Sequence, residues 1–253
     1  MSRFIDKLNR MAKGIPQTLG FKRAAADSTK PKVQIIVVPS KDATNLVVDG
    51  ADALLLRISS SSSIKKLLDK VSGENVIWGG WLEGGTQINT EELVKAGCDF
   101  LVFSADTPVT AIQNEEIGKI LEVEASLSEG MLRAVSGLPV DAVLIDTEAK
   151  EGHPFTWQNL ITLQRHSDFV GKPLLTPVAQ DVTGDELKAL WKAGIDGIIV
   201  ETDRESGRIK ELRQLIDSLD FPWPRRRQKT EAILPRTAGL TAPPAHDEEE
   251  EEE

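Results

Sequence analysis

The chain has 253 residues, 40% of them hydrophobic and 28% charged, a composition typical of a globular protein. Its net charge of −10 is uneven, because residues 1–32 carry +6, residues 33–221 carry −13 and residues 222–253 carry −3, and the acidic central part argues against nucleic acid as the main partner. The single cysteine, Cys98, excludes an intrachain disulfide, and no apolar run reaches the about 20 residues of a membrane span, so we expect a buried, inert thiol and a cytoplasmic protein.

The first predicted element is a helix over residues 2–15, SRFIDKLNRMAKGI. Phe4, Leu8 and Met11 recur at helical spacing, and Lys and Arg occupy the other faces. A basic amphipathic helix of this kind either lies on an anionic membrane surface or packs over one end of the domain, and the second interpretation is the simpler one. Residues 24–32 are predicted to form a linker.

From residue 33 onward, strand-like and helix-like segments alternate. Eight apolar, β-branched runs indicate strands over residues 33–40, 51–59, 75–81, 98–106, 119–126, 141–148, 172–179 and 196–203. Helical periodicity follows in residues 62–73, 89–97, 127–137, 155–171, 183–194 and 208–220. This alternation predicts a parallel sheet, and eight units predict closure into a (β/α)8 TIM barrel over residues 33–221.

Four predicted strands, the second, fourth, sixth and eighth, share a repeat that begins at an aspartate. The aspartates are Asp52, Asp99, Asp141 and Asp196. The third residue of each repeat is apolar: Leu55, Val102, Leu144 and Ile199. The fifth residues are Arg57, Ser104, Asp146 and Glu201, and the seventh are Ser59, Asp106, Glu148 and Asp203. Since alternate strands supply the same layer of a barrel lumen, we expect an apolar layer below two polar layers at the carboxyl end, where TIM barrels carry their active sites.

The third and fifth predicted strands add further side chains to this mouth. Gly79 and Gly80 separate Trp78 from Trp81, so one tryptophan faces the mouth and the other the helices. The glycines leave space either for a ligand or for aromatic packing. On the fifth strand, Glu122 and Glu124 share one face and Leu121 and Val123 the other. Because the face toward the helices is apolar, both glutamates are predicted to point into the lumen.

So many carboxylates around one axis are tolerated only if they are protonated, solvated, ion-paired or bound to a cation. A hard divalent ion such as Mg²⁺ or Mn²⁺ would relieve their repulsion, and Arg57 would suit a substrate carboxylate or phosphate. The alternative is a rim of solvated acids in which Arg57 forms an internal salt bridge and no ligand binds. The residues alone leave both alternatives open.

Residues 120–203, from ILEVEAS to IIVETD, resemble the second half of the metal-dependent hydroxy-oxo-acid aldolases and citrate lyase β-subunits, which bind pyruvate-like enolates. The resemblance implies that Glu124, in Val123-Glu124-Ala125, is a metal ligand and that Asp146 or Glu148 is the second. It also implies that Arg57 holds the substrate, although Arg57 lies on the second predicted strand. The implied activity is that of a divalent-metal-dependent lyase or aldolase acting on a small oxo-acid through an enolate.

The predicted site therefore has three groups of residues. These are Arg57 and Glu201 as catalytic residues, Ser59, Trp81, Ser104 and Asp106 as substrate-binding residues, and Glu124, Asp146 and Glu148 as ligands of Mg²⁺ or Mn²⁺. The alternative class is a catalytically silent barrel that acts as a scaffold or contacts a membrane surface or a protein through residues 1–24. A homo-oligomer is also left open. Residues 222–253 are rich in proline, contain Arg225–Arg227 and end in seven acids, so they are predicted to form a disordered tail, with Trp223, or Ile233 and Leu234, as the side chains that could hold it against the barrel or a partner.

Overall fold

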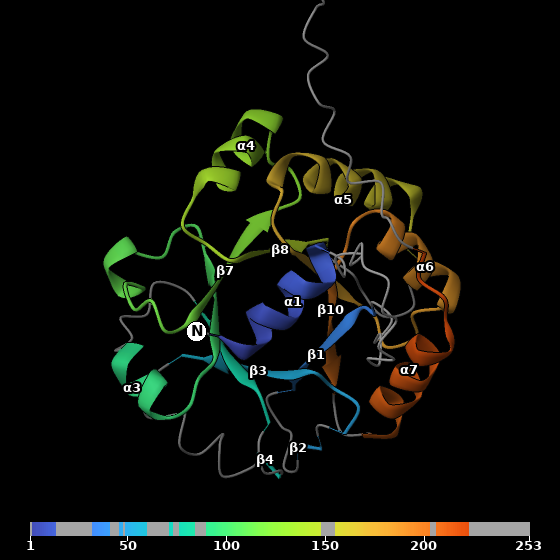
Figure 1. The fold of residues 1–253 in the computed structure, drawn as a ribbon, viewed down its shortest axis with the longest axis horizontal. Coiled ribbons are helices and arrows are strands. Elements are labelled where there is room, and N and C mark those ends of the chain that lie inside the picture. Colours follow the sequence, from blue (N-terminus) through green and yellow to red (C-terminus); the bar gives the residue numbers. More distant parts are fainter. Residues whose placement is uncertain are drawn as a thin grey trace, which may run out of the picture.

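A computed structural model of the chain describes residues 2–13, 32–40, 46–47, 49–59, 71–72, 76–83, 90–147, 155–202 and 206–222. Eight parallel strands close into a barrel in the order β1-β10-β9-β8-β7-β6-β5-β3 (Figure 1). They are β1 (Gln34–Pro39), β3 (Ala53–Ile58), β5 (Trp78–Leu82), β6 (Phe100–Ser104), β7 (Gly118–Glu124), β8 (Ala142–Asp146), β9 (Leu174–Val178) and β10 (Gly197–Thr202). The predicted (β/α)8 barrel is confirmed.

Helices surround the barrel, and one crosses its amino end. They are α1 (Arg3–Lys13), α3 (Thr90–Lys95), α4 (Glu129–Gly137), α5 (Trp157–Val170), α6 (Gly184–Lys192), α7 (Ser206–Ser218) and the short 3-10 helix η1 (Val109–Ala111). A capping box begins α6, where the Thr183 hydroxyl accepts from the Glu186 N–H at 3.3 Å and the Glu186 carboxylate accepts from the Thr183 N–H at 2.8 Å. None of the described helices is long and apolar enough to span a membrane.

The crossover that follows β3 differs from the prediction. A two-stranded sheet outside the barrel pairs β2 (Leu46–Val47) with β4 (Val71–Ser72). The helix predicted over residues 62–73 is therefore wrong at its end, where β-branched Val71 enters a strand ladder instead. Residues 60–70 lie outside the described part of the chain.

Each barrel strand is buried on both faces, which explains its nearly continuous apolar sequence. On β7, Leu121 and Val123 belong to the cluster that faces the helices, whereas Ile120 belongs to the lumen cluster. Trp78 packs in a second cluster on the helix side, and Trp81 packs against the lumen cluster. The predicted division of these strands into a lumen face and a helix face is correct.

Three of the four repeat aspartates hold neighbouring strands together at the amino end of the barrel. Each donates its N–H to the carbonyl of one residue on the adjacent strand, at 2.8 Å, and accepts that residue's N–H on its own carboxylate, at 2.8–2.9 Å. The pairs are Asp52 with Ile35, Asp141 with Lys119 and Asp196 with Leu174. This two-way pairing fixes the strand register. The first residue of the repeat therefore acts at the amino end of the barrel, whereas the fifth residue lies at the carboxyl end.

The fourth repeat aspartate holds α1 instead. Asp99 donates its N–H to the carbonyl of Trp78, but its carboxylate accepts from the Ser2 hydroxyl at 2.6 Å and from the N–H groups of Arg3 and Phe4 at 2.9 Å. A carboxylate at this position satisfies N–H groups that have no partner within the helix. Asp99 thus fixes α1 across the amino end of the barrel, where Figure 1 shows it.

The apolar face of α1 closes the lumen from below. Phe4 and Leu8 are fully buried in the lumen cluster, and the Phe4 ring stacks on the Phe100 ring with centroids 4.7 Å apart. Gly79 makes room for Phe100, because a Cβ there would lie 2.4 Å from that ring. This glycine therefore serves aromatic packing rather than a ligand. The helix packs over one end of the domain, which is the simpler of the two interpretations.

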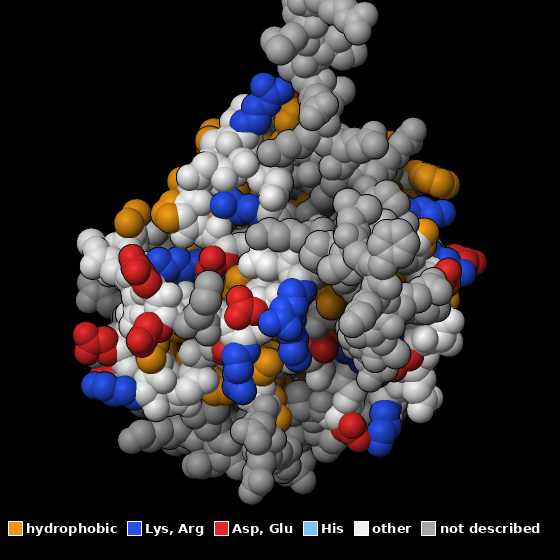
Figure 2. Space-filling model, in the orientation of Figure 1, with side chains coloured by type: hydrophobic (Ala, Val, Ile, Leu, Met, Phe, Trp, Pro, Cys, Tyr) orange, Lys and Arg blue, Asp and Glu red, His pale blue; other side chains and the backbone are white. Residues whose placement is uncertain are grey.

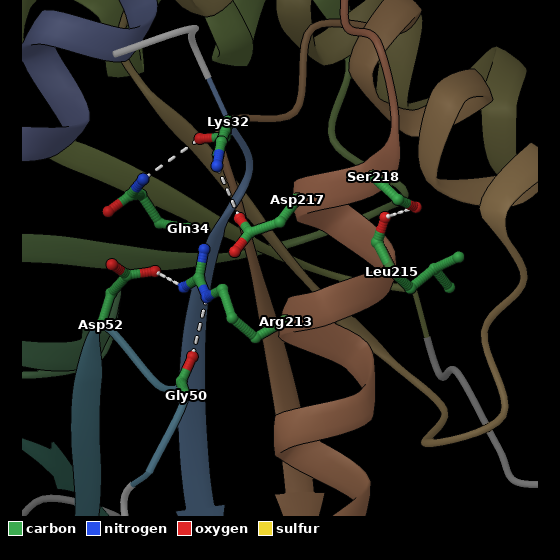
Figure 3. A network of polar contacts seen from close by, with 8 residues as sticks. All are labelled: Lys32, Gln34, Gly50, Asp52, Arg213, Leu215, Asp217 and Ser218. Atoms are coloured by element: carbon green, nitrogen blue, oxygen red, sulfur yellow. Dashed lines mark hydrogen bonds and ion pairs between the residues drawn. The ribbon is translucent and has the colours of Figure 1, made fainter. Parts of the chain in front are cut away.

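The last helix is tied to the first strands at the seam where the two ends of the barrel sequence meet (Figure 3). Arg213 on α7 donates from Nε to the Gly50 carbonyl at 2.9 Å and pairs with the Asp52 carboxylate. Lys32, just before β1, pairs with Asp217 at 2.7 Å. These contacts close the ring of helices with charge-assisted hydrogen bonds.

Candidate functional site

The carboxyl ends of the barrel strands form a polar layer directly above the apolar lumen. The third residues of the four repeats, Leu55, Val102, Leu144 and Ile199, are all buried in the lumen cluster. The fifth residues lie two positions further along the same strands and therefore on the same face: Arg57, Ser104, Asp146 and Glu201. The first of the two predicted polar layers is thus where the sequence placed it.

Arg57 is the centre of a polar network that spans the mouth. Its Nη2 lies 3.4 Å from Glu201 Oε1 and its Nη1 lies 3.7 Å from Glu83 Oε1. Its guanidinium carbon lies 4.8 Å from the centroid of the Trp81 ring, and Trp81 Nε1 donates to Glu122 Oε2 at 3.1 Å. The two predicted catalytic residues, Arg57 and Glu201, are therefore in contact. Glu83 was missed because it follows its strand singly, outside the repeat.

The network is open to water, which limits its strength. The side chains of Arg57, Glu83 and Glu201 retain 32%, 36% and 61% of their accessible surface. Ion pairs with this exposure contribute about 0–1 kcal/mol each. An incoming anion could therefore replace either glutamate on Arg57 at little cost.

The two described metal-ligand candidates lie side by side. Glu124 and Asp146 are register partners on the adjacent strands β7 and β8, so their Cα atoms are about 5 Å apart and their side chains start from the same face. Both residues are exposed, and Glu124 Oε2 accepts from the Ser126 hydroxyl at 2.9 Å. The third candidate, Glu148, lies outside the described residues.

Arg57 and this carboxylate pair stand on opposite sides of the mouth. In the closed strand order, β3 and β8 are separated by β5, β6 and β7 in one direction and by β1, β10 and β9 in the other. A ligand between Arg57 and Asp146 would therefore lie across the barrel axis. The sequence places both residues in one layer, but only the order of the strands shows that they are opposed.

The two described residues of the second predicted polar layer, Ser59 and Asp106, are not part of the sheet, and the other two, Glu148 and Asp203, lie outside the described residues. Strand β3 ends at Ile58 and β6 at Ser104, so Ser59 and Asp106 follow the strands and are exposed. After β6 the chain turns at once, because the Thr107 N–H donates to the Ser104 carbonyl at 3.1 Å. Of the four predicted substrate-binding residues, Trp81 and Ser104 line the mouth, whereas Ser59 and Asp106 stand beyond it.

A buried histidine behind the mouth was missed by the sequence analysis. His166 on α5 is fully buried, and its Nδ1 lies 2.8 Å from the Thr162 carbonyl. The neighbouring Arg165 donates to the carbonyl of Ala125 at 2.8 Å, next to Glu124. The Arg165 hydrogen bond attaches α5 to the end of β7. Burial lowers the pKa of His166 below its usual 6.5. Nothing in the sequence distinguishes His166 from the other polar residues of its helix, so its burial could not be predicted.

The lowered pKa of His166 predicts a loss of stability in mild acid. Below pH 6.5 the His166 imidazole takes up a proton in the unfolded chain, whereas the buried imidazole of the folded chain stays neutral. The contribution of His166 to the free energy of unfolding is therefore complete above pH 6.5 and declines as the pH falls toward the folded-state pKa. Urea unfolding of the wild type and of His166→Gln at pH 7.5 and 5.5 measures this. We expect a smaller pH dependence in the variant; equal dependence in both proteins would refute the assignment.

Cys98 is buried as predicted. Burial raises the pKa of its thiol to about 12, so the reactive thiolate is essentially absent at neutral pH. The Cys98 thiol instead donates to the Phe100 carbonyl at 3.3 Å. It is a packing residue and takes no part in the mouth.

No protein-family model matches the chain, and no match was found among curated protein sequences. Solved structures do match its fold. Phosphoribosyl anthranilate isomerase from Thermus thermophilus is 10% identical, with a TM-score of 0.52 over 74% of this chain and 99% of that chain. A mutant tryptophan synthase α-subunit from Pyrococcus furiosus is 12% identical, with a TM-score of 0.53 over 74% and 97%. Orotidine 5'-phosphate decarboxylase from Pyrococcus horikoshii is 17% identical, with a TM-score of 0.50 over 73% and 100%.

These comparisons establish the class of fold. The chain is a TIM-barrel protein, and this fold is typical of enzymes. At such low identity the likeness concerns the fold alone. None of the three structures is an aldolase or a citrate lyase, so they support the barrel part of the predicted resemblance and not the particular group.

Proposed function

We propose that the carboxyl-end mouth binds Mg²⁺ or Mn²⁺ together with a small carboxylate, and that the protein is a metal-dependent lyase or aldolase-like enzyme acting on an oxo-acid. The observation that carries this proposal is the pairing of Glu124 with Asp146 in register on the lumen face, opposite Arg57. The pair supplies negative charge for a cation, and Arg57 supplies positive charge for an anion.

The donor chemistry fits a hard divalent ion. Glu124 and Asp146 offer carboxylate oxygens, which Mg²⁺ and Mn²⁺ prefer. Among the residues that the structure describes, no group of three or more His, Cys, Asp or Glu could hold an ion. In this proposal these two carboxylates hold the ion, and water and ligand oxygens complete its shell, as is common for Mg²⁺.

The chain's own residues would orient the substrate and move its proton. Arg57 presents two guanidinium nitrogens, now paired with Glu83 and Glu201, that can hold a substrate carboxylate in their place. Glu201 Oε1, now 3.4 Å from Arg57 Nη2, would be displaced by the bound carboxylate and would accept a substrate proton beside it. Trp81 holds Arg57 from one side through its ring. When bound, the ion would stabilise the negative charge of an enolate oxygen.

Titration calorimetry with MgCl₂ and MnCl₂ tests the proposal. We expect millimolar or tighter binding by the wild type and at least about tenfold weaker binding by Glu124→Gln, which keeps the size of the side chain but removes its charge. Glu211→Gln, an exposed change on the outer helix α7, is the matched control and should bind like the wild type. No measurable binding by the wild type, or equal weakening by both variants, would remove the basis of the proposal.

A second candidate is a catalytically silent barrel that serves as a scaffold. It is favoured by Arg57 itself, which is already paired with Glu83 and Glu201 and stacked on Trp81. Lys and Arg side chains also lie over α1 on the outer face of the amino end (Figure 2), where Arg3 and Arg10 are exposed. Because the apolar face of α1 is buried in the barrel, contact with an anionic surface here would be electrostatic.

Sedimentation with vesicles that contain anionic phosphatidylserine tests the scaffold at a membrane. We expect pelleting in low salt that is lost in about 0.5 M NaCl and reduced in Arg3→Gln/Arg10→Gln, which removes two exposed positive charges. Pelleting that is independent of salt and of these two charges would contradict an electrostatic contact through α1.

A further inference from the structure

A large groove on the helical layer is lined mainly by residues of α5 and α6. These two helices are neighbours on the outside of the barrel (Figure 1). It encloses about 1040 Å³, and its lining is mainly apolar. The lining includes Trp157, Leu160, Ile161, Phe169, Trp191 and Pro222. Trp157 is 81% exposed and Ile161 61% exposed, although both are large apolar side chains. An exposed apolar surface of this kind marks a site of contact with another segment or molecule.

The described part of the chain ends in this groove. Phe221 is buried and packs against Trp191 with ring centroids 5.2 Å apart. The Trp191 indole N–H donates to the Pro222 carbonyl at 3.0 Å, and Pro222 itself lines the groove. Residue 223 therefore begins at the groove, and 31 further residues, 223–253, are attached at this point.

We infer that residues 223–234 of the same chain dock along this groove, with their apolar side chains against Trp157 and Ile161. The segment begins with Trp223 and ends with Ile233 and Leu234. Its twelve residues can extend over about 40 Å, whereas α5, with 14 residues, is about 21 Å long. The segment can thus follow the whole groove. Its covalent attachment raises its local concentration to the millimolar range.

The charges of the groove also suit this occupant. Asp168 and Asp185 are among the lining residues, and the tail carries Arg225–Arg227 a few residues after Pro222. The lining further contains Lys188 and Lys192, which would attract the tail's single acid before its terminal run, Glu231. The segment carries both signs of charge and has apolar side chains at each end. The groove is also lined by acidic, basic and apolar side chains, so the two surfaces can be complementary.

Limited trypsin digestion of the full chain, followed by intact mass, tests the inference. Trypsin cleaves after Arg225–Arg227, so docking of the segment should protect these bonds. We expect cleavage at least about tenfold slower than in a free peptide of residues 223–240, because burial of one large apolar side chain favours a bound state by about that factor. Ile161→Asp should raise the rate to that of the free peptide.

Met131→Asp is the matched control. Met131 is 55% exposed on α4 and is not part of the groove lining, so this change should leave the protection intact. Cleavage of the wild type at the peptide's rate, or equal effects of the two aspartate variants, would overturn the inference. Protection that increases with protein concentration would also overturn it, because it would assign the groove to a second copy of the chain. The test does not involve the mouth and is independent of metal binding.

Discussion

Phe4→Ala should lower the free energy of unfolding by about 3–5 kcal/mol. The Phe4 ring is fully buried, stacks on Phe100 and closes the lumen at its amino end, so its removal leaves a cavity against Leu8 and the lowest lumen layer. Neighbouring side chains cannot collapse into this cavity, since Asp99 holds the start of α1 in place. Urea unfolding followed by circular dichroism measures the change.

Arg10→Ala is the control for this prediction. Arg10 is on the same helix but exposed, so its replacement should change the free energy of unfolding by less than about 0.5 kcal/mol. A cost below about 1 kcal/mol for Phe4→Ala would show that α1 is not an integral part of the barrel core. In that case its apolar face would be available for another partner.

Asp196→Ala should lower the free energy of unfolding by about 2–3 kcal/mol. Asp196 is fully buried, and its carboxylate accepts the N–H of Leu174 at 2.8 Å. Alanine would leave this buried N–H without its partner and would break one half of the two-way pairing between β9 and β10. Urea unfolding gives the loss of stability, and hydrogen exchange at the Leu174 amide should be accelerated.

Asp141→Ala is the matched comparison, because it removes the same pairing from an exposed aspartate. Asp141 accepts the Lys119 N–H at 2.8 Å, but water can replace its carboxylate there. We expect a cost of less than about 1 kcal/mol. Equal costs for Asp141→Ala and Asp196→Ala would mean that burial does not decide the strength of these pairings.

The barrel could be predicted from the sequence because a strand that is buried on both faces has a nearly continuous apolar sequence. Each of the eight predicted runs overlaps one observed barrel strand, and the Asp52-type repeat placed Arg57, Asp146 and Glu201 on the lumen face. Side chains alternate between the two faces of a strand. Once one face is known to be apolar, the face of every side chain on that strand is therefore fixed. The same rule correctly separated Glu122 from Leu121.

The remaining features depend on contacts between distant residues. The sequence does not show where a strand stops, so Ser59 and Asp106 were assigned to a second layer, although β3 ends at Ile58 and the chain turns after Ser104. Gly79 was predicted to make space for either a ligand or an aromatic ring, and only its position opposite Phe100 decides between them. His166 could not be found, because its burial is a property of the packed helix and not of its neighbours in the chain.

The most direct test of the account is a crystal structure of the full chain soaked in MnCl₂, with anomalous scattering used to locate the ion. We predict one Mn²⁺ between the carboxylates of Glu124 and Asp146, within about 2.5 Å of both, that is lost in Glu124→Gln crystals. An empty mouth at saturating Mn²⁺, with Arg57 still paired to Glu83 and Glu201, would contradict the proposed site and leave the barrel a scaffold.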